Sequence, residues 1–175
     1  MIFRKRNNLE LNRPTLKIEM GPADLILEIL AIVGLLCFFG FTLYSITRVP
    51  DSVPTHFNAR GNPDDYGSKT FLWMLPVIAF VVYSILSLVV RIPEKSNYPV
   101  TITPANARRQ YTLRIRLLRY LKVAIVLMFF FISYKTVMVA QANSSGLGIW
   151  FLPVFLGIIL IPLIIYFILA QRNHL

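Results

Sequence analysis

Four long apolar segments alternate with polar stretches along the chain. They run from Ile29 to Thr47, Thr70 to Val90, Val123 to Ala140 and Ile149 to Gln171, and Lys135 is the one charged residue inside them. Each is long enough to cross a hydrocarbon core of about 30 Å as an α-helix. None shows the alternation of a membrane-spanning strand. The pattern predicts an all-α integral membrane protein with four transmembrane helices and an ordered outer loop between helices 1 and 2.

Composition agrees with the membrane class, and the distribution of charge predicts an orientation. The 175 residues are 56% hydrophobic and only 15% charged, against about 25% charged in soluble domains. Fourteen of the 18 Lys and Arg residues fall in the N-terminal segment, the segment between helices 2 and 3, and the C-terminal tail, and three fall between helices 1 and 2. This bias predicts that both termini lie in the cytoplasm. Because topology explains the net charge of +10, no nucleic-acid partner is expected.

Tryptophan positions support the same orientation. Trp73 and Trp150, the two tryptophans, stand at the starts of the second and fourth apolar segments. Both positions correspond to the outer interface, where amphipathic rings anchor a helix.

The chain divides into three parts. Residues 1–23 form a basic cytoplasmic segment, residues 24–92 hold helices 1 and 2 with the outer loop 48–69, and residues 93–175 hold a basic cytoplasmic loop with helices 3 and 4. Thr103 and Pro104 predict the start of a third helix of about 55 Å, so its first turns extend beyond the membrane core. The arginines of those turns are expected to contact lipid phosphates.

Two ionisable residues in or beside the apolar segments are expected to act separately. Glu28 lies one turn inside the first helix, close to polar surroundings. Lys135 lies near the opposite leaflet, where it either extends toward the headgroups or pairs with Asp64 or Asp65. Because Glu28 and Lys135 lie at opposite leaflets, the sequence predicts no charge pair of the kind that a transporter requires.

The outer segment from Val53 to Lys69 is the most specific polar stretch. Pro54 favours an extended leg, "NARG" and "NPDDYG" are typical of tight turns, and Ser68 is placed to cap the second helix. An extended leg puts His56 and Phe57 on opposite faces. We expect His56, Asn58 and Asp64 to form hydrogen bonds inside the loop.

The same stretch carries a motif. "PTHFN", a glycine at Gly61, and "DDYGSK" follow one another between Pro54 and Lys69. This order resembles a bacterial membrane-protein domain of unknown function that occurs in SdpI-like proteins, named for an immunity protein against a sporulation-delaying toxin. The resemblance covers about Thr47 to Pro76. It implies a bacterial cytoplasmic membrane protein with an immunity or sensing role. The larger immunity proteins carry more helices than the four expected here.

The sequence gives weaker support for a catalytic or a metal-binding role of the loop than for a structural one. A zinc hydrolase needs three protein ligands, whereas the loop offers one histidine. Asn58, Asn62, Asp64 and Asp65 are not spaced as a known calcium loop. A nucleophile made of Thr55 or Ser68 with His56 as base is possible by residue type only. The protein is therefore expected not to be an enzyme and to use no cofactor or metal.

The sequence predicts a binding protein whose outer loop recognises a peptide, a lipid or a membrane-protein partner. A peptide toxin or another membrane protein is the expected partner, beside the membrane lipids. Two alternatives remain open: a transporter or its accessory subunit, and a membrane-embedded enzyme centred on His56. The residues expected to contact the partner are Thr55, His56, Phe57, Asn58, Gly61, Asp64, Asp65 and Lys69.

Overall fold

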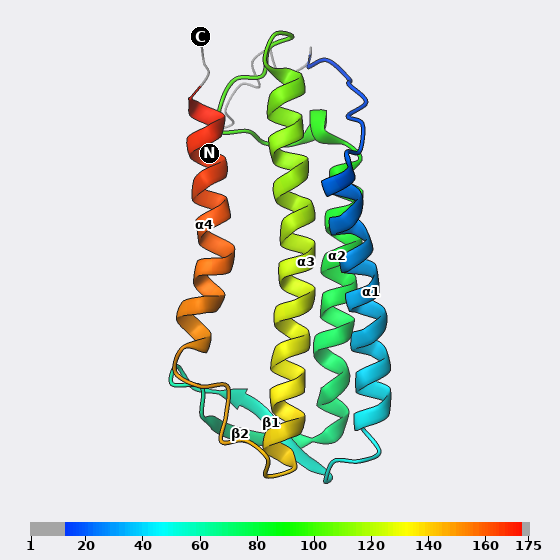
Figure 1. The fold of residues 1–175 in the computed structure, drawn as a ribbon, viewed down its shortest axis with the longest axis vertical. Coiled ribbons are helices and arrows are strands. Elements are labelled where there is room, and N and C mark those ends of the chain that lie inside the picture. The colour runs from blue at the N-terminus through cyan, green and yellow to red at the C-terminus, as the bar shows by residue number, and fades with distance from the viewer. Residues whose placement is uncertain (1–12, 173–175) are drawn as a thin grey trace, which may run out of the picture.

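A computed structural model describes residues 13–172 as four long helices and a short β-hairpin (Figure 1). The helices and strands, in chain order, are α1 (Pro22–Ser45), β1 (Ser52–Phe57), β2 (Pro63–Ser68), η2 (Lys69–Trp73), α2 (Met74–Val90), η3 (Pro93–Lys95), α3 (Ala107–Ala140) and α4 (Phe151–Gln171). Of the basic segment predicted for residues 1–23, residues 1–12 lie outside the described residues.

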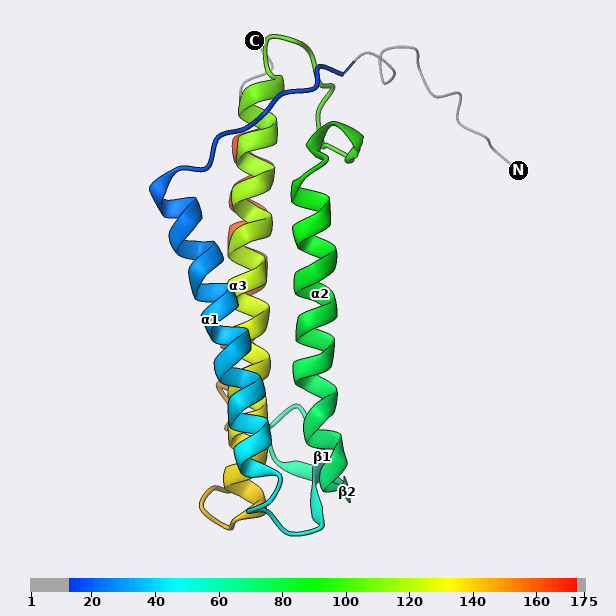
Figure 2. The same cartoon turned by 90° about the vertical axis from the view of Figure 1, so that its right-hand side faces the viewer.

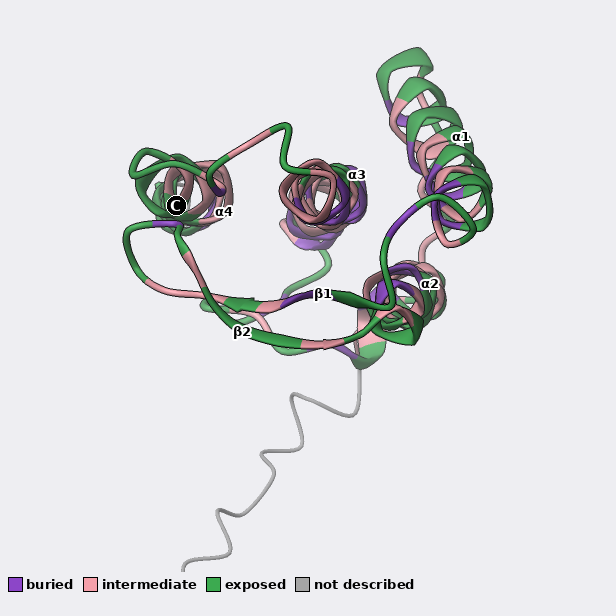
Figure 3. Ribbon diagram, turned by 90° about the horizontal axis from the view of Figure 1, so that it is seen from below, coloured by how far each residue is buried: buried purple, intermediate pink, exposed green. Residues whose placement is uncertain are grey.

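Helix α3 is the centre of the arrangement. It packs against α1, α2, α4 and β1, and α1 also packs against α2. Seen along the helices, α4 stands on the far side of α3 from α1, and the hairpin runs beneath the helices from α4 to α2 (Figure 3). We refer to the end of the bundle that carries the hairpin as the hairpin end. The opposite end, which holds residues 13 and 172, is the terminal end (Figure 1).

The three packed helices share a small apolar core, while most large apolar side chains face outward. Leu35 and Phe38 of α1 meet Ala79 of α2 and Val126 of α3 in this core. Leu36, Leu88 and Ile161 are examples of apolar side chains more than half exposed. All four helices are long and apolar enough to cross a membrane, as the sequence predicts. In a bilayer the outward apolar side chains would contact lipid rather than water.

Two prolines lie where the backbone tolerates them. Pro76 falls in the first turn of α2, where its missing N–H costs no hydrogen bond. Pro162 stands inside α4 and cannot donate to the carbonyl of Ile158 one turn earlier. The Tyr120 hydroxyl of α3 donates to that carbonyl at 3.1 Å, so α3 satisfies the group that Pro162 leaves open.

Two boundaries differ from the sequence-based expectation. The outer loop is a two-stranded antiparallel sheet, so the fold is not all-α. Helix α3 starts at Ala107 rather than at Pro104. Thr103 instead closes a separate turn, in which its carbonyl accepts from Asn106 and Ala107.

A cluster of buried charges joins α1 to α3. Lys122 Nζ donates to both carboxylate oxygens of Glu28, each at 2.6 Å, and to Ser87 Oγ at 3.2 Å. Arg119 Nε donates to Glu28 Oε1 at 3.2 Å. Arg119 Nη1 also lies 2.9 Å from Asp24 Oδ1, a charge contact without hydrogen-bond alignment. Two cations of α3 therefore pair with acids of α1, and Glu28 has a lysine partner, though not Lys135.

Residues 13–20 lie across the terminal end. Arg13 Nη1 donates to the carbonyl of Ser96 at 2.5 Å, and the Tyr111 hydroxyl donates to that of Pro14 at 3.2 Å. Leu16 and Ile18 pack on a buried apolar cluster that includes Tyr111. This segment therefore covers the ends of α2 and α3 instead of extending away from them.

Candidate functional site

The motif segment folds into the β-hairpin because its turn closes on itself. The amide of Asn58 donates to the carbonyl of Asn62 at 2.9 Å, and that of Gly61 donates to the carbonyl of Asn58 at 2.8 Å. The side-chain oxygen of Asn58 accepts from the amides of Arg60 and Asn62, at 2.9 and 3.2 Å. Gly61 has φ +79°, a conformation that glycine adopts without strain. The predicted turn over "NARG" is confirmed.

Polar side chains link the two strands of the hairpin. His56 Nδ1 lies 2.6 Å from Asp64 Oδ1, and the Thr55 hydroxyl donates to Asp65 Oδ2 at 3.3 Å. The register between the strands shifts on both sides of His56, and this irregularity places Asp64 beside the imidazole although His56 pairs with Asp65 along the ladder. The predicted hydrogen bonds of His56, Asn58 and Asp64 within the loop are thus present.

An ion pair closes the base of the hairpin. Lys69 Nζ lies 2.8 Å from Asp51 Oδ1, and the amide of Lys69 donates to the carbonyl of Asp51 at 2.9 Å. The hydrogen bond and the positive charge of Lys69 lower the pKa of Asp51. Next to it, Ser68 caps the short helix η2 by accepting from the amide of Thr70, as the sequence predicts.

The hairpin is fixed to the bundle at two places. At its base, Val49, Val53, Leu72 and Val137 form a buried apolar cluster. At its tip, the amide of Leu147 in the α3–α4 connection donates to the carbonyl of Gly61 at 2.7 Å. A Cβ on Gly61 would lie 2.6 Å from the carbonyl oxygen of Gly148, so the motif glycine permits this close backbone contact.

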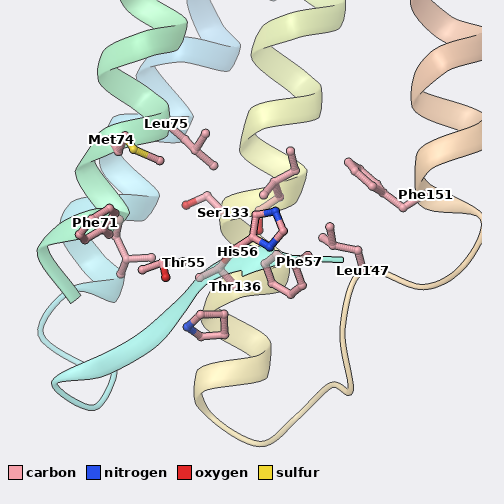
Figure 4. Close-up of a pocket in the computed structure, with 13 residues that line it drawn as sticks. Thr55, His56, Phe57, Phe71, Met74, Leu75, Ser133, Thr136, Leu147 and Phe151 are labelled. Atoms are coloured by element: carbon pink, nitrogen blue, oxygen red, sulfur yellow. The ribbon is translucent and has the colours of Figure 1, made fainter. Parts of the chain in front are cut away.

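A cavity of about 250 Å³ lies between the hairpin and the helices; we name it the hairpin pocket. The hairpin forms one wall and α3 another, and the α3–α4 connection with the start of α4 lies across from α2 (Figure 4). Most lining side chains are apolar, and Thr55, His56, Ser133 and Thr136 supply the polar ones. Its lining residues are Pro54, Thr55, His56, Phe57, Phe71, Leu72, Met74, Leu75, Ile132, Ser133, Thr136, Leu147 and Phe151.

Only some of the predicted site residues reach this pocket. Thr55, His56 and Phe57 line it, whereas Asn58, Gly61, Asp64, Asp65 and Lys69 are absent from its walls and hold the hairpin together. Phe57 is half-buried and His56 is exposed, but both line the pocket, where the register shifts between them, so they are not cleanly separated onto opposite faces.

Sequence reasoning missed the part of the pocket that other elements supply. Ser133 and Thr136 come from α3, and Leu147 and Phe151 come from the region around the start of α4. One signal was available: two hydroxyl residues three positions apart in an apolar helix lie on one face. The position of the α3–α4 connection against the hairpin tip had no comparable signal.

The geometry gives limited support to catalysis. Among the hydrogen bonds of the described residues, the His56 imidazole contacts Asp64 and neither Thr55 nor Ser68. Within residues 13–172, no group of three or more His, Cys, Asp or Glu side chains is arranged to hold a metal ion. Lys135 donates to Ser144 Oγ at 2.5 Å in the α3–α4 connection, so it extends toward the hairpin end and does not pair with Asp64 or Asp65.

Comparisons with known proteins identify a domain without assigning an activity. Residues 32–80 match the family described as a domain of unknown function (DUF1648). The matched range holds most of α1, the whole hairpin and the start of α2. The chain is also 28% identical to an uncharacterized protein of Archaeoglobus fulgidus over 162 residues, which cover 86% of this chain and 87% of that protein. No solved structure matches the chain. These findings describe a mostly helical chain with four helices long and apolar enough to cross a membrane, part of which is similar to this domain.

Proposed function

We propose that this chain is a non-catalytic protein of the bacterial cytoplasmic membrane, with both termini in the cytoplasm and the hairpin outside. The distribution of Lys and Arg supports this orientation. The positions of Trp73 and Trp150, both at the hairpin end, agree with it.

In this proposal the hairpin pocket recognises a membrane-inserted peptide. The main observation for this proposal is the apolar hairpin pocket, of which the motif segment forms one wall. The outer faces of the neighbouring helices are also apolar. At about 250 Å³ it is smaller than the roughly 300–1,000 Å³ of typical small-molecule sites, so it suits an apolar side chain of a larger partner. An SdpI-like role in immunity or sensing fits such a partner.

Transport is the weaker alternative. A second cavity lies beside the buried charge cluster, at the opposite end of the bundle from the hairpin pocket. The two cavities share no lining residue. An alternating-access site is expected near the middle of the membrane, with polar groups around it.

Site-specific photo-crosslinking tests the proposal. A benzophenone amino acid at Phe57 stands in the pocket wall, whereas one at Tyr66 stands on β2 with its side chain exposed. We expect a crosslinked peptide from position 57 only, and we expect Ser133→Phe, which fills the pocket, to abolish it. Equal crosslinking from both positions, or crosslinking that Ser133→Phe leaves intact, would contradict the proposal. Mass spectrometry of the adduct separates a peptide from a lipid or a membrane protein.

A further inference from the structure

A second cavity, of about 430 Å³, lies at the terminal end of the bundle; we name it the terminal cavity. Its lining residues come from the N-terminal segment, α1, α2, α3 and the segment after α2. Figure 2 shows the N-terminal end of α1 leaning away from α2, with α3 behind both helices. Residues 16–20 contribute part of its wall. Its lining residues are Leu16, Lys17, Ile18, Met20, Glu28, Tyr83, Ser87, Val90, Arg91, Pro93, Ile115, Arg119 and Lys122.

The inner wall of the terminal cavity is polar but close to neutral. Arg119 and Lys122 are 5% and 2% exposed, and they pair with Glu28 and with Asp24 behind it. Two cations and two acids cancel, so this wall alone gives little attraction for an anion. The pairing also holds Arg119 and Lys122 in fixed positions.

The outer part of the cavity wall is positively charged. Lys17 and Arg91 line it from the N-terminal segment and from the end of α2, and both are exposed. Neither forms an ion pair with another described residue. With the inner wall neutral, these two side chains make the cavity cationic overall.

The depth of the cavity corresponds to a lipid headgroup region. Lys122 stands 18 residues before Ala140, the last residue of α3 at the hairpin end. At 1.5 Å per residue this is about 27 Å, close to the thickness of a hydrocarbon core of about 30 Å. The cavity therefore opens at the boundary between acyl chains and headgroups in the leaflet at the terminal end.

We propose that the terminal cavity binds the phosphate group of an anionic phospholipid from that leaflet. Lys17 and Arg91 contact the phosphate. The apolar side chains of Leu16, Ile18 and Met20 contact the glycerol and the first acyl carbons. Basic pockets between transmembrane helices are known to select anionic headgroups in this way. The proposal is independent of the hairpin pocket and of the direction in which the chain crosses the membrane.

Native mass spectrometry of the full chain, purified in detergent, tests this site with two lipids and one ion. We expect phosphatidylglycerol to be retained in preference to phosphatidylcholine. Lys17→Gln/Arg91→Gln should lower the affinity for phosphatidylglycerol about twenty-fivefold, since each cation near a headgroup contributes about fivefold. Because both side chains are exposed, the melting temperature should be unchanged.

Lys95→Gln/Arg108→Gln is the matched control, because it removes two exposed cations at the same end that do not line the cavity. It should leave phosphatidylglycerol binding unchanged. Equal losses in the two double variants, or no preference of the unmodified chain for phosphatidylglycerol, would overturn the proposal. Inorganic phosphate is the third arm. If it displaces phosphatidylglycerol at equal concentration, the site takes a free phosphate and the lipid assignment is wrong.

Discussion

The imidazole of His56 and the carboxylate of Asp64 meet across the hairpin, with Nδ1 2.6 Å from Oδ1. Both side chains are largely open to solvent, 66% and 41% exposed. The pair holds β1 and β2 together at the place where their register shifts. His56 also lines the hairpin pocket, so the same side chain forms a structural contact and is part of the proposed binding surface.

Substitution of His56 separates these two roles. His56→Ala should lower the free energy of unfolding by no more than about 1 kcal/mol, because exposed pairs contribute little. His56→Asn should cost less, since it keeps a hydrogen-bonding group. Thermal melting in detergent and crosslinking from position 57 are the measurements. Both variants should still crosslink in proportion to folded protein. A complete loss of crosslinking at an unchanged melting temperature would show instead that His56 acts directly on the partner.

Gly61→Ala should detach the hairpin tip from the α3–α4 connection. The new Cβ would lie 2.6 Å from the Gly148 carbonyl oxygen, and φ is +79°. The expected loss is about 1–3 kcal/mol, measurable by melting or by faster proteolysis near Leu147. Gly40→Ala is the control, because a Cβ there has nothing within 4 Å. Equal melting temperatures for the two variants would contradict the close contact.

Lys122→Met should be among the most damaging single changes. It leaves Asp24 and Glu28 with Arg119 as the one buried cation beside them in the described part of the chain, and breaking a buried ion pair typically costs about 3–5 kcal/mol. The double variant Glu28→Gln/Lys122→Met should recover part of the loss, because no unpaired charge then remains. Lys135→Met is the matched change on the same helix, and it should cost less because Lys135 contacts the neutral Ser144. The yield of monodisperse protein and its melting temperature test this ranking.

Cysteine labelling tests the proposed orientation. In a Cys37→Ala background, cysteine at Arg60 should react with an impermeant thiol reagent in intact cells, whereas cysteine at Lys95 should react only after lysis. Both positions are exposed, so a difference between them reports the side of the membrane. The reverse pattern would place the termini outside.

The Asp51–Lys69 pair predicts a small effect of pH at the base of the hairpin. Lys69 lowers the pKa of Asp51 below its ordinary value of 3.8, so the pair favours the ionised carboxylate in the folded state. Its stabilising contribution is present above that ordinary value and is lost as the pH falls through the lowered one. NMR titration of the Asp51 carboxyl in micelles should show the lowered pKa, and Lys69→Gln should return it to the ordinary range. An unchanged pKa in Lys69→Gln would argue against the contact.

Local information in the sequence was enough for the helices and for the turn. Uninterrupted apolar runs require helices, because only a helix or a closed barrel satisfies the backbone in lipid. Asn58 and Gly61 predict the hairpin turn, since one side chain caps its amides and the other residue adopts positive φ. The extended leg predicted from Pro54 is strand β1, but the turn predicted over "NPDDYG" is wrong, because Pro63–Ser68 pairs with β1 as strand β2. Prolines and paired acids are poor strand formers, and tertiary packing determines their pairing.

Contacts between distant parts of the chain were decided only by the tertiary structure. Glu28 and Lys122 are 94 positions apart, and their pairing depends on how α1 rotates against α3. A charge-counting argument assigns Lys122 only to the cytoplasmic side, because it has no information on which helix faces it. The hairpin pocket has the same origin: Thr55 and His56 were apparent from the motif, but Ser133 and Phe151 reach them only when α3 and α4 are in place. Periodicity identifies the faces of a helix, and packing determines which faces meet.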